Sequence, residues 1–333
     1  MPKTYRLLPA TDYVEDLISS IDIAKTRIAM IALTIAEDDD TRSLIDALCR
    51  ASQRGVAVSV GFDIYFTYRE IEKTSRRLSL IPQRLGLMRE TKRRLERAGV
   101  KVRWLGMATF PFLLRRTHTK WSVVDDTVYS FGGVNLYKLG ITSSIDYMFR
   151  VDGSELADLI QSEHRRIIHS DKAGHGYRSH MFGSASHTIL IDGGKLFDSI
   201  IYRHALIYAR EATNIQFVSQ YCPTGQLGRL LAKHPSAQLY FNHWHNTRDP
   251  INRLMIRFNS LRTGASTNYT GSTYLHAKFI LFTMPTGQKI AITGSHNFIS
   301  GGGMLGTREV ALETTDPAII GQLEDFLDKH IRT

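Results

Sequence analysis

Apolar residues recur along the chain either with helical spacing or in short continuous runs. Residues 14–21 carry apolar side chains every three or four positions, which predicts a helix with Asp12 as its N-cap. Residues 28–35 form a continuous apolar run, as in a buried strand. A helical pattern over 41–54 and a second strand pattern over 56–62 follow. This order of strand, helix and strand predicts a largely parallel sheet that is covered by helices.

The second half of the chain repeats that order. Residues 188–191 and 215–221 form strand-like runs, and helical spacing covers 195–212 between them. Residues 170–187 are rich in Ser, Gly and His with little periodicity, which predicts a link between domains. We therefore predict an α/β protein of three parts, namely an N-terminal domain over 1–169, the link over 170–187 and a C-terminal domain over 188–333. The same patterns predict further elements, namely helices over 69–97, 154–169 and 316–330, helices that start near 223 and 249, and strands over 101–105 and 237–241.

Two short stretches of the sequence carry the same pattern of polar residues. In each, a histidine and a lysine stand two positions apart and lead into an apolar run, so both side chains are expected on the same face of one strand. After a turn, a second strand ends in small residues, where a backbone can approach a ligand, and an asparagine supplies amide donors nearby. The first copy contains His118, Lys120, Asp125, Gly132, Gly133 and Asn135, and the second contains His276, Lys278, Gly294, Ser295 and Asn297.

The chemistry of these groups indicates a phosphate site. An imidazole, an ammonium and an amide from each copy are suited to surround a phosphoryl centre. Phosphoryl transfer needs one group to attack and another to protonate the leaving group. The presence of two copies therefore predicts that both take part in one reaction.

The two stretches resemble the signature of the phospholipase D superfamily, which is His-x-Lys, four residues, Asp, six residues, Gly-Gly or Gly-Ser, and a nearby Asn. The first copy matches this signature at every position. The second copy has Thr283 in place of the aspartate and a longer turn before its glycine. In the family the aspartate supports the site and does not attack phosphorus, so its loss is expected to affect rigidity more than chemistry. The resemblance implies two α/β domains related by pseudo-two-fold symmetry, with mixed sheets flanked by helices and one shared active-site cleft.

The resemblance also implies a mechanism. One histidine attacks the phosphorus of a phosphodiester and forms a covalent phosphohistidine, while the other protonates the departing alcohol. An acidic residue after each motif orients a catalytic imidazole, and Asp146 and Glu309 occupy the two matching places. No metal or other cofactor is implied. The family offers both orders of attack, so the identity of the nucleophile stays open. The groups that the resemblance assigns to the non-bridging oxygens are Lys120, Lys278, Asn135, Asn297 and Ser295.

Composition and charge narrow the partners of such a site. The net charge of +10 and the pI near 9.6 predict a polyanionic partner, either nucleic acid or an anionic membrane surface. No apolar run is long enough to span a bilayer, and residues 1–6 lead into no signal-peptide core, so we expect a cytoplasmic protein that associates peripherally with the membrane. Cys49 and Cys222 lack metal spacing and are expected as packed thiols in a reducing compartment.

Residues 107–116, directly before the first motif, form an apolar segment that contains a proline. Its apolar side chains, such as Phe110, either fill the core or insert into the headgroup boundary of a membrane, where Arg115 and Arg116 would bind lipid phosphate. The many arginines over 69–97 form either a solvated helix face or a basic patch that faces an anion.

Three polar clusters outside the motifs contain residue types that can bind a metal, but the sequence favours other roles for them. The acidic run over 37–40 precedes a predicted helix, where carboxylates stabilise the N-terminus. The histidines of the expected link have neither cysteines nor clustered carboxylates beside them, so we interpret them as solvated. His243 and His245 lack a third ligand and are interpreted as part of a polar loop.

Three functions remain open. The Gly-Gly-Val-Asn end of the first copy and the two-copy layout look most like the cardiolipin synthase and phosphatidyltransferase branch, so a phospholipid is the expected substrate. The alternative is a nuclease of the same superfamily that acts on DNA or RNA, which the net charge favours. A non-catalytic phosphate-binding scaffold is the third hypothesis, because of Thr283. The headgroup, the acceptor alcohol and the oligomeric state stay open.

Overall fold

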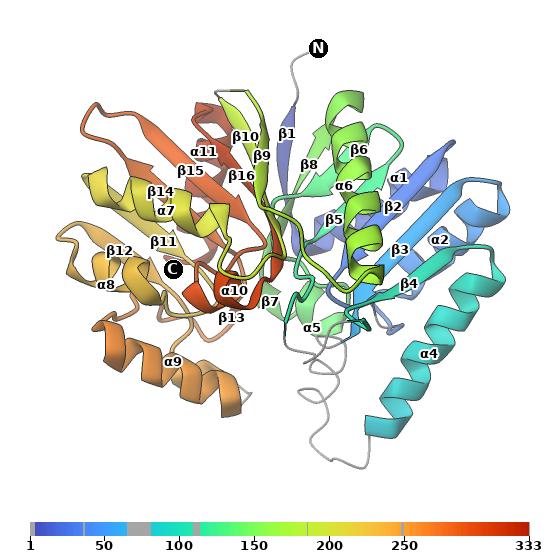
Figure 1. Cartoon of the computed structure of the whole chain (residues 1–333), viewed down its shortest axis with the longest axis horizontal. Helices are drawn as coiled ribbons and strands as arrows, with labels where there is room; N and C mark the ends of the chain where they lie inside the picture. The colour runs from blue at the N-terminus through green and yellow to red at the C-terminus, as the bar shows by residue number, and fades with distance from the viewer. Residues whose placement is uncertain are drawn as a thin grey trace. The chain divides into compact units, whose positions relative to one another are not determined.

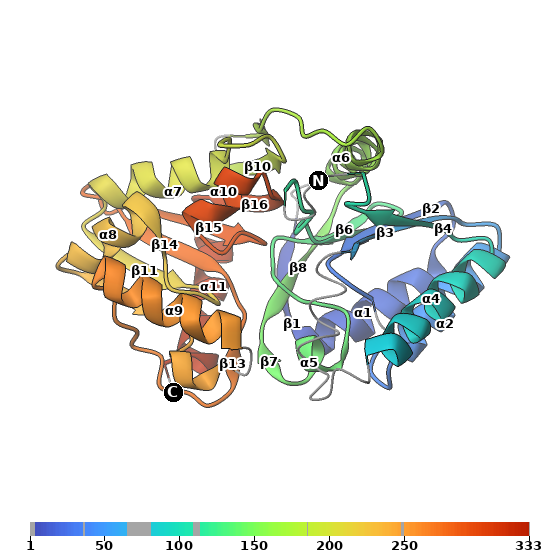
Figure 2. The same ribbon diagram turned by 60° about the horizontal axis from the view of Figure 1, so that its bottom comes forward.

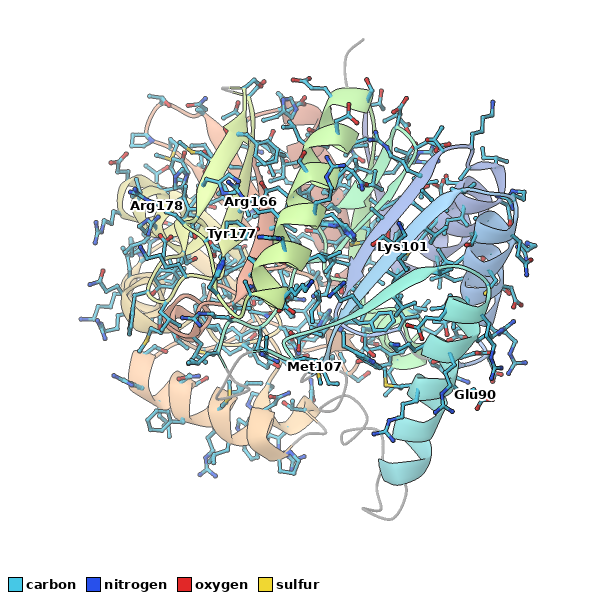
Figure 3. The ribbon with its side chains drawn as sticks, turned by 45° about the vertical axis from the view of Figure 1, so that its right-hand side comes forward. Glu90, Lys101, Met107, Arg166, Tyr177 and Arg178 are labelled. Atoms are coloured by element: carbon cyan, nitrogen blue, oxygen red, sulfur yellow. The ribbon has the colours of Figure 1, made fainter. Side chains whose placement is uncertain are left out.

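The computed structural model of the chain describes residues 4–35, 37–64, 81–108, 114–184, 186–247 and 250–332. These residues form two compact units (Figure 1). Unit 1 comprises Met1–Ser130, Val134–Ser143 and Tyr147–Gly176, and unit 2 comprises Phe131–Gly133, Ser144–Asp146 and Tyr177–Thr333. Two short segments from the first half of the sequence therefore belong to unit 2. Tyr177, at which the main part of unit 2 begins, is labelled in Figure 3.

Unit 1 is built on a mixed sheet of seven strands. The strands β2, β3 and β4 run parallel, as the order of strand, helix and strand predicts, whereas the other neighbours pair antiparallel. The antiparallel part arises because the first motif continues into β5 and β6, which a tight turn joins. In spatial order the strands are β1 (Tyr5–Pro9), β8 (Tyr147–Asp152), β6 (Thr127–Ser130), β5 (Trp121–Val124), β2 (Arg27–Ala32), β3 (Ala57–Asp63) and β4 (Lys101–Leu105).

Helices cover both faces of this sheet. Its helices are α1 (Ala10–Ile23), α2 (Arg42–Gln53), α4 (Ile81–Arg97), α5 (Lys138–Ile141) and α6 (Ser154–Lys172). Figures 1 and 2 show α6 on the face opposite α1 and α2. Leu17, Leu44 and Val60 are fully buried in the core that α1 and α2 form with the sheet. The apolar spacing of three or four residues thus marks the buried side of each helix.

Unit 2 contains a second mixed sheet of seven strands. Of its pairs, β11 and β12 are parallel and the others are antiparallel. In spatial order the strands are β12 (Ala237–Tyr240), β11 (Asn214–Val218), β14 (Phe279–Thr283), β15 (Lys289–Gly294), β16 (Arg308–Thr314), β10 (His187–Gly193) and β9 (His180–Gly183). A separate parallel pair joins β7 (Ser144–Ile145) to β13 (Tyr274–Leu275).

The two sheets share one topology. From β1 to β3 in unit 1 and from β10 to β12 in unit 2, corresponding strands follow the same spatial order and pair with the same sense. This confirms two α/β domains of one fold, each with a mixed sheet flanked by helices. The helices of unit 2 are α7 (Ile200–Glu211), α8 (Gly225–Lys233), the 3-10 helix η2 (Trp244–Asn246), α9 (Pro250–Thr263), α10 (Ser300–Leu305) and α11 (Pro317–His330).

Several element boundaries differ from those that the sequence predicts. Helix α1 begins at Ala10, directly after Pro9, so Asp12 lies in its first turn and is not the N-cap. Helix α7 begins at Ile200 rather than near 195, because the hydroxyl of Ser199 accepts a hydrogen bond from the Tyr202 backbone N–H and caps the helix there. The strand β1 pairs with β8 although no apolar pattern predicts it.

The stretch over 170–187 contains more regular structure than its composition predicts. Helix α6 continues to Lys172, and β9 begins at His180. The chain passes from unit 1 to the main part of unit 2 between Gly176 and Tyr177. The predicted helical residues before Ile81 and the residues 109–113 lie outside the described part of the chain.

The acidic run over 37–40 stabilises the start of α2, as its position before that helix predicts. The Asp38 carboxylate accepts hydrogen bonds from the backbone N–H groups of Asp40 and Thr41 and from the Thr41 hydroxyl. It also accepts one from the backbone N–H of Lys138 at 2.7 Å, which ties α5 to the same turn.

Candidate active site

The first half-site lies in unit 1, in the segment that leads into β5. His118 and Lys120 precede the strand, which begins at Trp121, so the prediction that both lie on a strand is wrong. Their side chains nevertheless meet, because Lys120 Nζ lies 3.2 Å from His118 Nε2 and donates a hydrogen bond to the His118 carbonyl oxygen. Both residues are buried. A buried ammonium beside an imidazole favours the binding of an anion.

Asp63, the last residue of β3, fixes the chain just before His118. Its carboxylate accepts a hydrogen bond from the Thr117 backbone N–H at 2.8 Å and lies 3.7 Å from Arg116 Nη1. Arg116 also donates through Nη2 to the Gly106 carbonyl oxygen at 2.9 Å. No pattern in the sequence points to Asp63, because a lone aspartate at a strand end does not show which segment packs over it.

The position of Arg116 corrects one expectation about the apolar segment before the motif. Its side chain is only 2% exposed, so its guanidinium is not at the surface to meet a lipid headgroup. A Cβ on Gly106 would lie 2.2 Å from Arg116 Nη1, so this glycine leaves the space that the guanidinium fills. Arg115 donates through Nη1 to the Gly174 carbonyl oxygen at 2.9 Å. Phe110 lies outside the described residues.

Asp125, the aspartate of the first motif, supports the backbone around it. It lies in the turn after β5, at the opposite end of that strand from Lys120. Burial raises the pKa of Asp125, but hydrogen bonds outweigh this effect and lower the pKa to about 2. Asp125 thereby ties the turn to the start of β2. The donors are the Thr26 hydroxyl at 2.6 Å and the backbone N–H groups of Lys25, Thr26 and Arg27 at 2.8, 2.8 and 3.0 Å.

The matching position in unit 2, Thr283, is tied to the neighbouring strand in another way. Its carbonyl oxygen accepts hydrogen bonds from the backbone N–H of Thr213 at 2.8 Å and from the Thr213 hydroxyl at 3.0 Å. Thr213 directly precedes β11, the counterpart of β2. A backbone carbonyl therefore supplies an anchor where the first copy uses the Asp125 carboxylate, at the end of β14 that is remote from Lys278.

The second half-site lies in unit 2, between β13 and β14. Lys278 is fully buried, its Nζ lies 3.1 Å from His276 Nδ1, and it donates a hydrogen bond to the His276 carbonyl oxygen. The backbone N–H groups of His276 and Ala277 both donate to the Ile145 carbonyl oxygen, at 3.0 and 2.9 Å. The histidine and lysine are thus held by their own backbone and by the short strand β7.

Asp146 pairs with the histidine of the second copy. Its Oδ2 lies 2.5 Å from His276 Nδ1, and both side chains are buried. A carboxylate at Nδ1 stabilises the tautomer that carries its proton there, which leaves the Nε2 lone pair available. Asp146 follows the first motif in the sequence, yet it belongs to unit 2 together with His276. The spacing after each motif identifies this carboxylate but not the histidine that it contacts.

Gly133, from the glycine pair of the first motif, also lies in the second half-site. A Cβ at this position would lie 2.7 Å from Lys278 Nζ and 2.8 Å from each carboxylate oxygen of Asp146. Only a glycine therefore lets the backbone pass this close to the ammonium and the carboxylate. Gly132 belongs to the same short segment of unit 2, Phe131–Gly133, whose Phe131 carbonyl oxygen accepts a hydrogen bond from the Thr293 hydroxyl at 2.8 Å.

Ser295 and Glu309 form a second buried pair in unit 2. The Ser295 hydroxyl donates to Glu309 Oε2 and accepts from the Val310 backbone N–H at 3.0 Å. The hydroxyl proton that was expected on a phosphate oxygen is thus directed to Glu309. Gly294 is close to the same strand, because a Cβ there would lie 2.2 Å from the Val310 carbonyl oxygen.

Asp192 is a buried acid beside this pair that no sequence motif indicates. It lies on β10 directly opposite Glu309 of β16, and it accepts a hydrogen bond from the Ile200 backbone N–H at 2.7 Å at the start of α7. Burial, together with the nearby Glu309 charge, raises the pKa of Asp192 to about 7 despite a hydrogen bond from the Ser199 hydroxyl. A single aspartate inside an apolar strand gives no signal of its cross-strand neighbour.

The two motif asparagines keep unused hydrogen-bonding capacity. Asn135 and Asn297 are 3% and 7% exposed, and within the described residues the Oδ1 atom of each has no partner. A buried amide that lacks a partner is unfavourable unless a ligand meets it. Because the oxygen and nitrogen of an amide exchange places by a flip, each side chain can turn a donor towards an anion.

The titration of Lys278 predicts the alkaline limit of activity. Burial lowers the pKa of Lys278 to about 8, although the charges of Asp146 and Glu309 act in the opposite direction. The ammonium is therefore charged below about pH 8 and neutral above it. We expect kcat/KM for an anionic diester to fall as the pH rises through about 8, because this parameter reports the free enzyme. The measurement is a pH profile of kcat/KM from pH 6 to 10, a range of about four units around that value.

The matched variant for this profile is Lys278→Arg, whose guanidinium stays charged across the whole range. We expect it to lower activity at neutral pH, because a fully buried pocket fits the ammonium, and to remove the alkaline fall. An alkaline limb that is unchanged in Lys278→Arg would assign the titration to another group.

Known proteins match about half of the chain in sequence. A family model described as "Cardiolipin synthase, PLD-like domain" matches residues 17–168. Cardiolipin synthase B of Salmonella typhimurium is 27% identical over 162 residues, which cover 47% of this chain and 36% of that protein. Cardiolipin synthase B of Salmonella typhi has the same identity and coverage. The chain thus matches little more than a third of the length of these curated relatives.

Solved structures match nearly the whole chain in fold. Phosphatidylserine synthase of Haemophilus influenzae Rd KW20 aligns with 98% of this chain and 86% of its own, with a TM-score of 0.71 and 13% identity. Polyphosphate kinase of Porphyromonas gingivalis aligns with 98% of this chain and 50% of its own, with a TM-score of 0.61 and 12% identity. At these identities the likeness concerns the fold alone. The family match over residues 17–168 and the two motif copies agree, and the chain is similar to proteins of the phospholipase D superfamily.

Proposed function

We propose that this chain is a phosphodiester-cleaving transferase that acts on phospholipid, either by phosphatidyl transfer or by hydrolysis. The observation that carries the proposal is the 2.5 Å hydrogen bond between Asp146 and His276 Nδ1, beside the buried Lys278 ammonium. An imidazole that a carboxylate orients and a cation accompanies is equipped to form and break bonds to an anionic phosphorus. His118 and Lys120 repeat the same imidazole and ammonium in unit 1.

The first step forms a covalent intermediate. Nε2 of one histidine, His118 or His276, attacks the phosphorus, and an N–P bond forms while the P–O bond to the departing alcohol breaks. The other histidine, in its protonated form, gives its proton to that alcohol oxygen as the bond breaks. The protein then carries a phosphohistidine, and the second histidine is neutral.

The second step regenerates the enzyme. The neutral histidine takes the proton of an incoming alcohol or water, whose oxygen attacks the phosphorus of the phosphohistidine. A new P–O bond forms, the N–P bond breaks, and both histidines return to their first protonation states. An alcohol acceptor gives a transferred phosphatidyl group, and water gives phosphatidic acid.

The buried cations stabilise the negative charge that develops on the non-bridging oxygens during the reaction. Lys120 and Lys278 are 1% and 0% exposed, so their charges act in a medium of low polarity, where electrostatic interactions are strong. Asn135 and Asn297 each have an Oδ1 without a partner among the described residues, and a flip of the amide turns an N–H donor to that side. Within each unit the lysine is buried beside its motif histidine before substrate binds, which lowers the reorganisation needed in the transition state.

Phospholipid is the favoured substrate because of the matched relatives. The family model and both curated relatives are named for cardiolipin synthase. The net charge of +10 suits an anionic membrane surface, with which we propose that the protein associates peripherally. The same charge keeps a nuclease as the alternative. The third hypothesis, a scaffold without activity, loses its main support because Thr283 lies away from Lys278 and is anchored by its backbone.

The substrate class is tested by offering three labelled phosphate esters in parallel, namely the phosphodiester phosphatidylglycerol, CDP-diacylglycerol, whose diphosphate releases CMP, and single-stranded DNA. We expect headgroup release or exchange from at least one lipid, in the presence of EDTA and at a rate well above that of His276→Ala, with no cleavage of DNA. EDTA keeps contaminating metal-dependent hydrolases from contributing. Faster cleavage of DNA than of either lipid would establish the nuclease, and turnover of none of the three would leave the scaffold.

A further inference from the structure

Helix α9 carries an apolar stripe that faces away from its own unit. Leu254, Phe258 and Leu261 are 69%, 58% and 78% exposed. Their spacing of four and three residues places them on one side of the helix. Met255, which is 36% exposed, extends the stripe towards one edge. Three neighbouring large apolar side chains with this exposure are unusual on a soluble surface, where apolar residues are normally scattered.

The opposite side of α9 is the side that packs. Asn252 and Ile256 are 5% and 1% exposed, and Ile256 belongs to the core cluster of unit 2. The helix contacts α8, beside which it lies in Figure 2, and it also contacts η2. The apolar stripe therefore takes no part in the core, and the helix is amphipathic towards the outside.

Arginines flank the stripe on both sides. On a helical projection, Arg253 and Arg257 lie along one edge of the stripe and Arg262 along the other, and all three are exposed. The Arg257 guanidinium lies 5.5 Å from the centroid of the Trp244 ring, and Arg253 donates to the Thr247 carbonyl oxygen at 3.2 Å. These contacts hold two of the cations beside the apolar side chains.

We propose that α9 is the helix with which this protein docks on an anionic phospholipid bilayer. An apolar stripe between two rows of arginine fits the boundary of a bilayer, where side chains enter the acyl region and guanidinium groups meet lipid phosphates. No helix among the described residues is long and apolar enough to cross a membrane. The choice of phospholipid rests on the proposed function, whereas the outward stripe and its charge do not.

Two other occupants fit the surface less well. A nucleic acid would meet the arginines but would offer Leu254, Leu261 and Met255 little apolar surface along its backbone. A second copy of the chain would cover the leucines but would bring its own arginines against those of the first copy, and like charges repel. The charge complementarity therefore favours an anionic bilayer, and the other two occupants become outcomes of the test.

The test compares binding to vesicles of phosphatidylglycerol and phosphatidylcholine by sedimentation, which needs no turnover. The variant Leu254→Ser, Phe258→Ser, Leu261→Ser removes the stripe, and we expect vesicle affinity to fall about tenfold or more. The matched control, Ile23→Ser with Ile207→Ser, removes two apolar side chains that are 76% and 49% exposed on other helices, and we expect it to bind as the wild type does. Equal affinity of the stripe variant and the wild type would overturn the proposal.

A charge pair at one position keeps the test decisive if the triple variant does not fold. Leu261→Glu and Leu261→Lys remove the same apolar group at the most exposed position of the stripe and differ in charge. We expect Leu261→Glu to bind phosphatidylglycerol vesicles more weakly than Leu261→Lys by about tenfold, because each cation near an anionic surface contributes measurably to binding. Equal binding of the two variants would exclude contact between α9 and the lipid surface.

Further measurements separate this inference from the proposed function. Turnover of a short-chain diester that stays in solution should be nearly the same in the stripe variant and the wild type. If the wild-type protein binds vesicles through α9 but turns over no lipid, the proposed function is refuted while the role of α9 in docking stands. A change from dimer to monomer in the stripe variant with unchanged vesicle affinity would assign the stripe to contact between copies. If the stripe variant binds vesicles as the wild type does but binds single-stranded DNA more weakly, the stripe would be assigned to contact with nucleic acid.

Discussion

Replacing either motif histidine with alanine is expected to abolish turnover, by a factor of at least about 10⁴. Attack on phosphorus and protonation of the leaving alcohol are separate duties, so neither histidine can take over for the other. The fold should survive, because His118 and His276 lie in irregular segments before β5 and β14 and are outside the apolar cores. The measurement is the single-turnover rate on labelled phospholipid, with circular dichroism to confirm folding.

The matched control for the histidine variants is His204→Ala. His204 is a partly buried histidine on α7 whose Nδ1 lies 2.6 Å from a Glu313 carboxylate oxygen, so it has a carboxylate partner but no neighbouring lysine of the motif. We expect its activity to stay near that of the wild type. If His118→Ala or His276→Ala keeps more than a few per cent of activity, the paired mechanism is wrong.

Replacing Asp146 with asparagine is expected to lower kcat by about 10² to 10⁴, with a much smaller change in KM. Asparagine has nearly the same shape but turns an amide towards His276 Nδ1 and no longer stabilises a proton there. The ring can then adopt the wrong tautomer, and its charged form loses its counter-ion. The measurement is kcat and KM on a short-chain diester together with the pH profile of kcat/KM.

Asp125→Asn provides the contrasting result. The pKa of Asp125 is lowered to about 2, so its carboxylate stabilises the folded protein at neutral pH, and this contribution disappears as the pH falls from about 4 towards 2. We expect the asparagine variant to unfold at a lower temperature but to keep most of its kcat. The idea that Asp125 is structural fails if kcat falls as far as in Asp146→Asn.

The sequence predicts the chemistry of the half-sites better than their geometry. His276, Lys278 and Asn297 could be identified because their residue types and their spacing are visible in the sequence itself. The shared strand order of the two sheets follows from the two copies of the motif. In contrast, the place of His118 and His276 just before a strand could not be predicted, because an apolar run does not mark where regular pairing begins.

The contacts of the supporting carboxylates could not be predicted because their partners are distant in the sequence. Asp63 fixes Thr117 from 54 positions away, and Asp146 meets His276 from 130 positions away. The apolar stripe on α9 could not be predicted for a related reason. Its apolar period predicts a helix, but only the packing of Ile256 shows that the leucines are on the outer side.

The short segments Phe131–Gly133 and Ser144–Asp146 have a consequence for how such a gene can be rearranged. A hybrid enzyme that borrows only residues 177–333 from this chain would receive His276 and Lys278 without Asp146, and would depend on its host for a glycine at position 133. Substitutions near the second motif are thus constrained by residues that the first half of the gene encodes. The two domains, although similar in topology, must therefore be inherited together and evolve together.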